Sequence, residues 1–232
     1  MYRRMLLLAC TVAAAWPCAA ADVAFSGVLP NGAVYRQPVE SMQERRFRNL
    51  VRQHTDYSCG AAALATILRY AYHLDADEST VIEGMMGVSD PALVHQRGFS
   101  LLDIKRYVEA LGMRGRGYRI SEERLRTLRV PGLVLMDVRG FRHFVVLKQV
   151  RGDMAELADP ILGNRLLPLQ DFLAAWPSRA VFIVIGSDFD RDTALLLPSE
   201  KPSARALYAR QGAGTLTDAE LVDFGFTHAD LF

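Results

Sequence analysis

The sequence predicts an α+β domain in which the helices come first and the strands follow. Patterns typical of helices occupy the chain from Gly60 to about Ser121, whereas short apolar or alternating runs dominate from Leu133 to Gly186. Turn residues separate these later runs, as expected for the strands of an antiparallel sheet. Helices and strands that are segregated along the chain predict two packed halves, one of helices and one formed by a sheet.

The helical half is predicted from helix-end signals as well as from apolar spacing. The expected helices span residues 60–72, 77–86 and 101–111, with a short fourth helix from Ser121. Asp75 and Glu78 stand at capping-box spacing at the start of the second helix, and Ser100 and Asp103 do so at the start of the third. Gly112 is positioned to end the third helix.

The sheet half is predicted from four strand-like runs. They span residues 133–138, 143–150, 154–159 and 180–186, with a short helix over 167–176 between the last two. A turn at residues 151–153 folds the second run back on the third. Counted from this turn, His143 faces a residue between about 160 and 162, so Asp159 lies within a few positions of His143. The turn type or a bulge decides whether both side chains share a face.

The first 21 residues have the features of a cleaved export signal. Arg3 and Arg4 form a basic start, an apolar core runs from Met5 to Trp16, and Ala19–Ala21 provides a small-residue cleavage site. The apolar core is too short to span a bilayer. Lipoprotein processing at Cys10 is the alternative, but it would leave a still shorter apolar core. We therefore expect a periplasmic protein, with secretion as the less favoured destination.

Composition argues against two classes of partner. Lys and Arg number 27 against 26 Asp and Glu, and this near-neutral balance disfavours a dedicated nucleic-acid partner. After the signal, no stretch approaches the roughly 18 uninterrupted apolar residues that span a bilayer, so no stable membrane insertion is expected. We expect no cofactor and no bound metal.

Cys59 stands out once the signal is removed. Cys10 and Cys18 belong to the signal, which leaves Cys59 alone in an exported chain. Exported proteins usually carry cysteines in pairs or not at all, because a single thiol is open to oxidation and mispairing. A buried structural cysteine is one interpretation. We favour a reactive thiol, because the N–H groups and the dipole at a helix N-terminus lower the pKa of a thiol.

His143 is the best candidate for the base that a nucleophilic cysteine requires. It opens a predicted strand, and Asp159 at the end of the next strand would hold the imidazole in one tautomer. Alternatively, Asp159 is an ordinary strand-ending residue before Pro160. The remaining histidines are expected to be loop or surface residues: His54, His73, His95 and His228.

Attack on an amide also requires a hydrogen-bond donor for the developing oxyanion. Gln53 stands six residues before Cys59, where a side-chain amide helped by a backbone N–H would serve. As an isolated residue, Gln53 would be an ordinary surface glutamine.

Together these motifs resemble those of the bacteriocin-processing peptidases, the double-glycine leader peptidases found at the front of peptide-exporting ABC transporters. Gln53 followed by Cys59 and Gly60 resembles their nucleophile motif, and "RHFVVL" from Arg142 resembles their histidine motif. "ADP", whose Asp lies sixteen residues after His143, resembles their aspartate motif. The order and the spacings agree over about residues 48–187.

The resemblance implies a papain-like cysteine peptidase fold, whose helical half carries the nucleophile and whose antiparallel sheet carries His and Asp. It makes Cys59 the nucleophile, His143 the base, Asp159 the orienting residue and Gln53 the oxyanion donor. It also implies cleavage after small residues, typically Gly-Gly. With the residue patterns described above, we expect a signal peptide over 1–21, a lead-in segment over 22–47, the peptidase domain over 48–187 and a tail over 188–232.

Two departures from the family pattern are visible. Ser58 stands where members often have Asp before the cysteine. Because no transporter segment follows the domain, we expect the chain to be closer to standalone exported members, including those that accompany functional-amyloid secretion. Its expected partner is then a secreted or secretion-associated polypeptide.

Two alternatives stay open: another acyl transfer on the same scaffold, by a transpeptidase or an amidase, and peptide binding without catalysis.

Overall fold

The structure, a computed structural model, describes residues 21–25 and 35–197. The chain divides into two compact units, residues 1–42 and residues 43–232. Most of the predicted signal peptide and most of the predicted tail lie outside the described residues. All four predicted site residues belong to the second unit.

The described part of the first unit is a pair of strands. β1 (Ala21–Phe25) pairs antiparallel with β2 (Tyr35–Val39). The short helix α1 (Met42–Arg46) begins at the boundary between the units. In the part of the chain that the structure describes, no helix is both long enough and apolar enough to cross a membrane.

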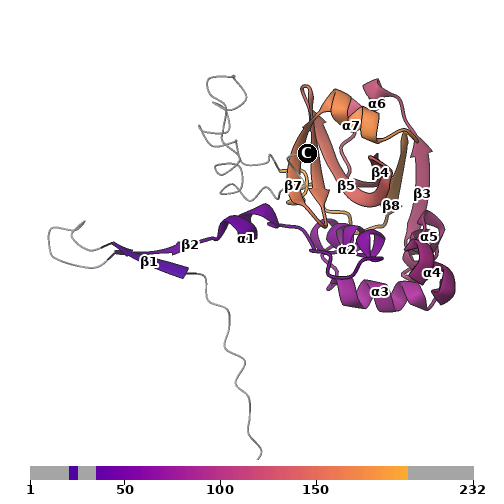
Figure 1. Cartoon of the computed structure of the whole chain (residues 1–232), viewed down its shortest axis with the longest axis horizontal. Coiled ribbons are helices and arrows are strands. Elements are labelled where there is room, and N and C mark those ends of the chain that lie inside the picture. The colour runs from indigo at the N-terminus through magenta and orange to yellow at the C-terminus, as the bar shows by residue number, and fades with distance from the viewer. Residues whose placement is uncertain (1–20, 26–34, 198–232) are drawn as a thin grey trace, which may run out of the picture. The chain divides into compact units, whose positions relative to one another are not determined.

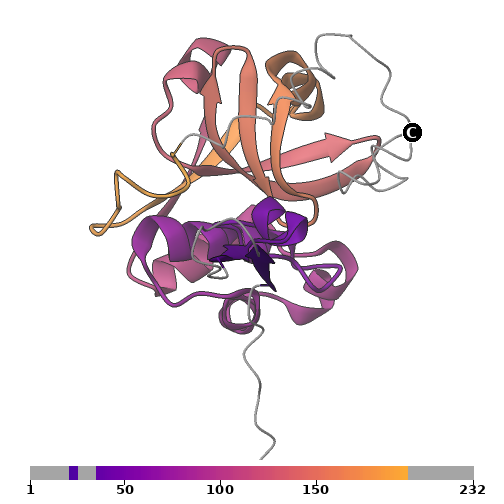
Figure 2. The same cartoon turned by 90° about the vertical axis from the view of Figure 1, so that its left-hand side faces the viewer.

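Four helices build one half of the second unit, coloured purple in Figures 1 and 2: α2 (Cys59–Tyr72), α3 (Glu78–Met86), α4 (Pro91–Arg97) and α5 (Leu101–Ala110). The central helix α2 is buried along most of its length. Its small residues allow close packing, since a Cβ built on Gly60 would lie 3.2 Å from Cδ2 of Phe144. The start of α2 is therefore pressed against the sheet.

The helix ends confirm one predicted cap and correct another. At α5, Ser100 is the N-cap of the predicted capping box. At α3, the capping box is formed by Asp77 and Thr80, so the prediction from Asp75 and Glu78 was wrong. Several polar residues in succession match the cap pattern, and only the backbone conformation decides which of them is the cap. Glu78 is consequently the first residue of α3 and not part of its cap.

An antiparallel sheet of six strands forms the other half, in the order β3-β8-β4-β5-β6-β7. The strands are β3 (Arg114–Arg119), β4 (Gly132–Val138), β5 (Phe141–Arg151), β6 (Met154–Asp159), β7 (Gly163–Pro168) and β8 (Ala180–Ile185). Two short helices accompany the sheet: α6 (Glu122–Thr127) and α7 (Leu169–Ala175). The predicted α+β class is confirmed.

Both edge strands of the sheet were missed in the sequence. β3 consists of Arg, Gly and Tyr and is almost fully exposed, so it lacks the apolar and β-branched residues that mark a strand. Its pairing with β8 explains one of its glycines, because a Cβ at Gly115 would lie 2.4 Å from Cζ of Phe182. Pairing with β8 thus stabilises β3 as a strand, although its own residues do not favour one.

Two buried clusters lie on opposite faces of the sheet. In β5, Phe144 and Val146 belong to the cluster around α2, whereas Val145 and Leu147 belong to the cluster that includes residues of α6 and α7. Burial on both faces explains the continuous apolar run of β5. Packing of α2 on the first face brings the N-terminus of this helix next to the start of β5.

The last described residues return to α2. The N–H of Asp190 donates to the carbonyl of Ala71 over 2.9 Å, and Leu195 is fully buried. The chain from Asp190 to Leu195 is therefore held against the rest of the second unit, beside the end of α2.

Candidate active site

Helix α2 presents Cys59 at its N-terminus. Cys59 is the first residue of the helix, and the N-cap Ser58 makes no side-chain hydrogen bond to the first turn. The N–H groups of this turn therefore keep their partial positive charge without a capping side chain. Within residues 21–25 and 35–197, Cys59 is the one free cysteine, and its side chain is half-buried.

The thiol of Cys59 lies against the backbone of β5. Burial raises its pKa and is the largest influence. The N–H groups of Phe144 and Gly60 lower the pKa, while the charge of Asp159 raises it further, and the net direction is upward. The predicted lowering of this pKa was wrong for this structure, because that prediction weighed the helix terminus and not the burial of the thiol beneath β5.

His143 and Asp159 form a buried pair in the same region. Nε2 of His143 lies 3.0 Å from Oδ2 of Asp159, and the two side chains are 5% and 2% exposed. A carboxylate can only accept, so this contact assigns the ring proton to Nε2. In the neutral ring Nδ1 then carries no proton, and it is buried with no hydrogen-bond partner among the described residues. A neutral imidazole with an unoccupied nitrogen is the form that can accept a proton.

Backbone groups also hold Asp159 in its ionised form. Its Oδ1 accepts from the N–H of Ile161 (2.9 Å) and from that of Leu162 (3.1 Å). Burial raises the pKa of Asp159, but the hydrogen bond and charge of His143 and the two N–H groups outweigh it and lower the pKa. Nη1 of Arg165 on β7 lies 3.9 Å from Oδ2. Nothing in the sequence singles out Arg165, because β7 was not predicted.

The register of β5 and β6 explains how this pair forms. Val146 pairs with Ala158, beyond a register shift in β5. Asp159 follows Ala158, so its side chain falls on the opposite face of the sheet, which is also the face of His143. The question that the sequence left open, whether both side chains share a face, is thereby answered.

Gln53 is tied to the turn that follows Asp159. Its N–H donates to the carbonyl of Pro160 over 2.9 Å, and its Nε2 donates to the carbonyl of Thr55 over 2.6 Å. The second N–H of Nε2 stays available to another acceptor. Oε1 is buried and has no partner among the described residues. The structure thus places Gln53 beside the Asp159 turn, with its amide engaged inside its own loop.

The segment before Gln53 is clamped to the same turn. Nε of Arg46 donates to the carbonyl of Leu162, and Nδ2 of Asn164 donates to the carbonyls of Arg46 (3.1 Å) and Arg48 (2.8 Å). Side-chain bonds to distant carbonyls leave no pattern in a sequence, and this clamp was not predicted. One turn therefore positions both Asp159 and the segment that leads to Cys59.

Phe141 covers part of His143 at the solvent side. The two ring centroids are 5.4 Å apart with planes at 32°, and Phe141 is 59% exposed whereas His143 is buried. The sequence offered a signal for this contact, since residues two apart in a strand share a face. Phe141 therefore adds an exposed apolar surface beside the imidazole.

Each of the other described histidines has a partner of its own. These partners are Glu78 for His54, Asp190 for His73 and the ring of Tyr57 for His95. His228 lies outside the described residues.

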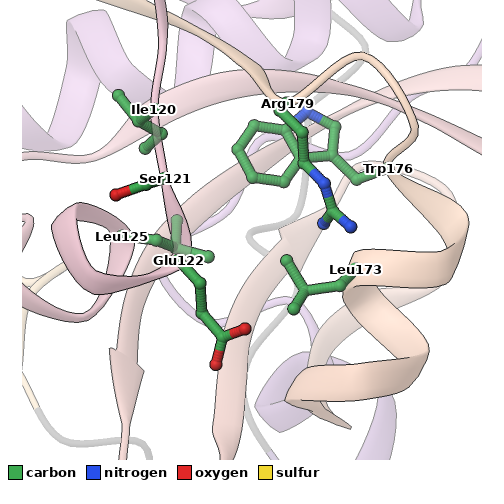
Figure 3. A pocket seen from close by; sticks show the side chains of 7 residues that line it. All are labelled: Ile120, Ser121, Glu122, Leu125, Leu173, Trp176 and Arg179. Carbon is green, nitrogen blue, oxygen red and sulfur yellow. The ribbon is translucent and has the colours of Figure 1, made fainter.

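Two cavities lie away from these candidate residues. One of about 160 Å³ is lined by Leu125 of α6, Leu173 of α7, Trp176 and Arg179, among others (Figure 3). The other, of about 220 Å³, lies where β8 passes the end of α2. Neither of these two cavities is lined by Cys59 or by the other candidate residues.

Comparison with known proteins places the chain in a family. The model of the peptidase C39 family matches residues 48–188. The probable functional amyloid protease FapD of Pseudomonas fluorescens is 49% identical over 218 residues, which cover 94% of this chain and 95% of that protein. FapD of Pseudomonas aeruginosa is 48% identical over 213 residues and covers 92% of both chains.

Solved peptidase domains share the fold. A double glycine motif protease from an AMS/PCAT transporter, in complex with the leader peptide, is 27% identical with a TM-score of 0.50, covering 60% of this chain and 91% of that one. The peptidase domain of Streptococcus ComA is 17% identical with a TM-score of 0.51, covering 60% and 98%. These similarities confirm the predicted fold. The chain belongs to the peptidase C39 family and is a cysteine peptidase.

Proposed function

We propose that this chain is an exported, periplasmic peptidase that cleaves after small residues, of the Gly-Gly type, in a secreted or secretion-associated polypeptide. In this proposal Cys59 is the nucleophile, His143 the base, Asp159 the residue that orients the base and Gln53 an oxyanion donor. One observation carries the assignment: the imidazole of His143 is bound to Asp159 through Nε2, its Nδ1 is buried without a partner among the described residues, and the charge of the same Asp159 acts on the thiol of Cys59.

The first half of the reaction acylates Cys59. The sulfur attacks the carbonyl carbon of the scissile bond, and the S–H proton passes to Nδ1 of His143. Burial raises the pKa of this thiol, which favours a proton transfer that accompanies the attack. Asp159 stabilises the imidazolium through Nε2. His143 then returns the proton to the leaving amine as the C–N bond breaks, which leaves a thioester on Cys59.

The second half releases the other product. His143, again neutral, takes a proton from water, and the hydroxide adds to the thioester carbonyl. The C–S bond breaks, the sulfur regains the proton, and the product leaves with a new carboxylate. In both halves the negative oxygen is stabilised by the N–H groups at the start of α2 and by the second amide N–H of Gln53.

The substrate class is supported by the relatives. Two proteins that match this chain at nearly half of its positions are named as probable functional amyloid proteases, and a similar solved domain is a double glycine motif protease. An exported component of a functional-amyloid system is therefore the substrate we propose. The export signal predicted over residues 1–21 supports a periplasmic location.

Cleavage in ¹⁸O-labelled water tests this function. Peptides of exported polypeptides with a Gly-Gly pair are incubated with the protein, and the products are analysed by mass spectrometry. We expect cleavage after the pair, one ¹⁸O in the new carboxylate, and no cleavage by Cys59→Ala. Transfer to an added amine without ¹⁸O would identify a transpeptidase. Binding that is equal in both variants, without cleavage in either, would identify a binding module and overturn the proposal.

A further inference from the structure

Glu78 begins helix α3, but its carboxylate binds the loop of residues 54–58, which joins Gln53 to Cys59. Oε1 and Oε2 accept from the N–H of His54 at 2.9 and 3.0 Å, and Oε1 accepts from the N–H of Thr55 at 3.3 Å. Nδ1 of His54 lies 2.7 Å from Oε2. The carboxylate of Glu78 is 7% exposed, so these bonds form in a largely dry environment.

The same carboxylate also accepts a hydrogen bond from the hydroxyl of Ser58. Oγ of Ser58 lies within hydrogen-bond distance of Oε1 of Glu78 and of the Thr55 carbonyl, and both of these groups accept. Ser58 is the N-cap of α2, where a serine hydroxyl ordinarily accepts from the N–H groups of the first turn. Here it makes no such bond. Glu78 thus keeps the capping oxygen away from the N–H groups that face the thiol.

The contact is not needed to start α3. Asp77 caps that helix together with Thr80, through bonds that do not involve Glu78. Burial raises the pKa of Glu78, but hydrogen bonds from His54, Ser58 and Thr55 outweigh it and lower the pKa, so the carboxylate is charged at neutral pH. The buried, charged Glu78 side chain thus forms its hydrogen bonds with the 54–58 loop and not with its own helix. We therefore infer that its role concerns that loop.

We propose that Glu78 is a positioning residue of the peptidase site. It holds the loop over 54–58 and thereby fixes the position of the Gln53 amide relative to the Cys59 thiol. It also keeps the N–H groups in the first turn of α2 free of a side-chain cap, so that they can stabilise the thiolate and the oxyanion. Glu78 acts through the loop and does not touch the substrate. This inference rests on the proposed function of Cys59 and Gln53.

The test compares Glu78→Ala with a matched neighbour, Asp77→Ala. Asp77→Ala removes a carboxylate from the same helix start and weakens the α3 cap, but it leaves the bonds to the 54–58 loop in place. Glu78→Gln retains the size of the side chain and one acceptor oxygen. For each variant we would measure kcat and KM on a cleaved Gly-Gly peptide, the rate of Cys59 alkylation by iodoacetamide, and the melting temperature.

We expect Glu78→Ala to lower kcat by up to about 10²-fold with little change in KM, because a displaced catalytic group costs rate more than binding. Its alkylation rate at fixed pH should fall, because the released Ser58 hydroxyl can cap α2. Glu78→Gln should recover part of both, and Asp77→Ala should lower the melting temperature alone. Equal kcat and equal alkylation rates in Glu78→Ala and Asp77→Ala would overturn the inference.

Two controls keep the outcomes separate. If Glu78→Ala does not fold, Glu78→Gln is compared with Asp77→Asn, and an unchanged kcat and alkylation rate in Glu78→Gln then counts against the inference. Alkylation does not require peptidase activity. A wild-type protein that cleaves no peptide, but whose alkylation rate still depends on Glu78, would refute the proposed function and not the positioning role.

Discussion

The two ends of β6 carry buried carboxylates in different surroundings. At the hairpin end, Glu156 lies 3.3 Å from Nε of Arg151 and accepts from Nε2 of Gln149 at 3.2 Å. At the other end, Asp159 is bound to His143 and to two backbone N–H groups. Both residues are less than a twentieth exposed. Burial alone therefore does not distinguish them.

The partners distinguish the two ends. Arg151 is a permanent cation, so its contact with Glu156 is an ion pair that has no proton to exchange near neutral pH. His143 instead carries an imidazole, whose second nitrogen is without a partner among the described residues and is able to accept a proton. The comparison therefore predicts a chemical role for the Asp159 end, whose partner can still take a proton, and a structural role for the Glu156 end.

The largest expected effect is the loss of activity when Cys59 or His143 is removed, which would locate the chemistry at the Asp159 end of β6. Cys59→Ala or His143→Ala should each abolish most peptidase activity, and the double variant should lose little more, because the two residues act as one unit. Steady-state cleavage of a Gly-Gly peptide measures this. Substantial activity in His143→Ala would mean that another group is the base. The difference between the Asp159 and Glu156 ends of β6 would then have no catalytic consequence.

Gln53 should come next in size. Gln53→Ala removes the proposed oxyanion donor and should cost about 10²–10³ in kcat, with KM little changed. The same cleavage assay, run over a range of substrate concentrations, separates the two constants. An increase in KM at constant kcat would show that Gln53 only contacts the substrate, while the roles of Cys59 and His143 would stand.

Paired substitutions at the two ends sharpen the comparison directly. Asp159→Ala should lower kcat by about tenfold to 10²-fold, since the imidazole still acts as a base when it is poorly oriented. Glu156→Gln should leave kcat unchanged and cost about 1–3 kcal/mol in the free energy of unfolding, because it weakens a buried contact. Cleavage kinetics measure kcat of both variants, and urea unfolding measures their free energy of unfolding. If Glu156→Gln lost as much kcat as Asp159→Ala, the two ends would not differ in role.

The smallest expected effect concerns the pH dependence of the thiol. Because burial raises the pKa of Cys59 above its ordinary value, the thiolate forms only as the pH rises through that raised pKa. Alkylation by iodoacetamide should therefore continue to accelerate above about pH 8.5, the ordinary pKa of a free thiol. Rates measured between pH 5 and 10 on the wild-type protein test this direction, and a plateau reached well below 8.5 would contradict it.

Local patterns were enough to predict the parts of the site that depend on neighbours in sequence. The helix that begins at Cys59, the cap at Ser100 and the strands that end with Asp159 and begin near His143 all follow from spacing, apolar runs and turn residues. The motif around Gln53 and Cys59 also pointed to the family before any contact was known. These features are determined within a few residues, where side-chain type and backbone preference act directly.

Contacts across the fold decided what the sequence left open or led us to predict wrongly. The register shift in β5 turned His143 and Asp159 to one face, and the turn after Asp159 bound the segment that leads to Cys59. Burial between α2 and β5 reversed the expected pKa shift of the thiol. Glu78, expected in a helix cap, instead binds the loop of residues 54–58 that precedes Cys59.

By itself, the sequence determined which chemical groups this protein carries and the order of the helices and strands that bear them. Only the tertiary structure decided which of these groups meet, which lone pairs stay without a partner and how far each charge is removed from water. The reason is physical: helix and strand preferences act over a few residues, whereas hydrogen bonding and desolvation at a site depend on atoms brought together from distant segments.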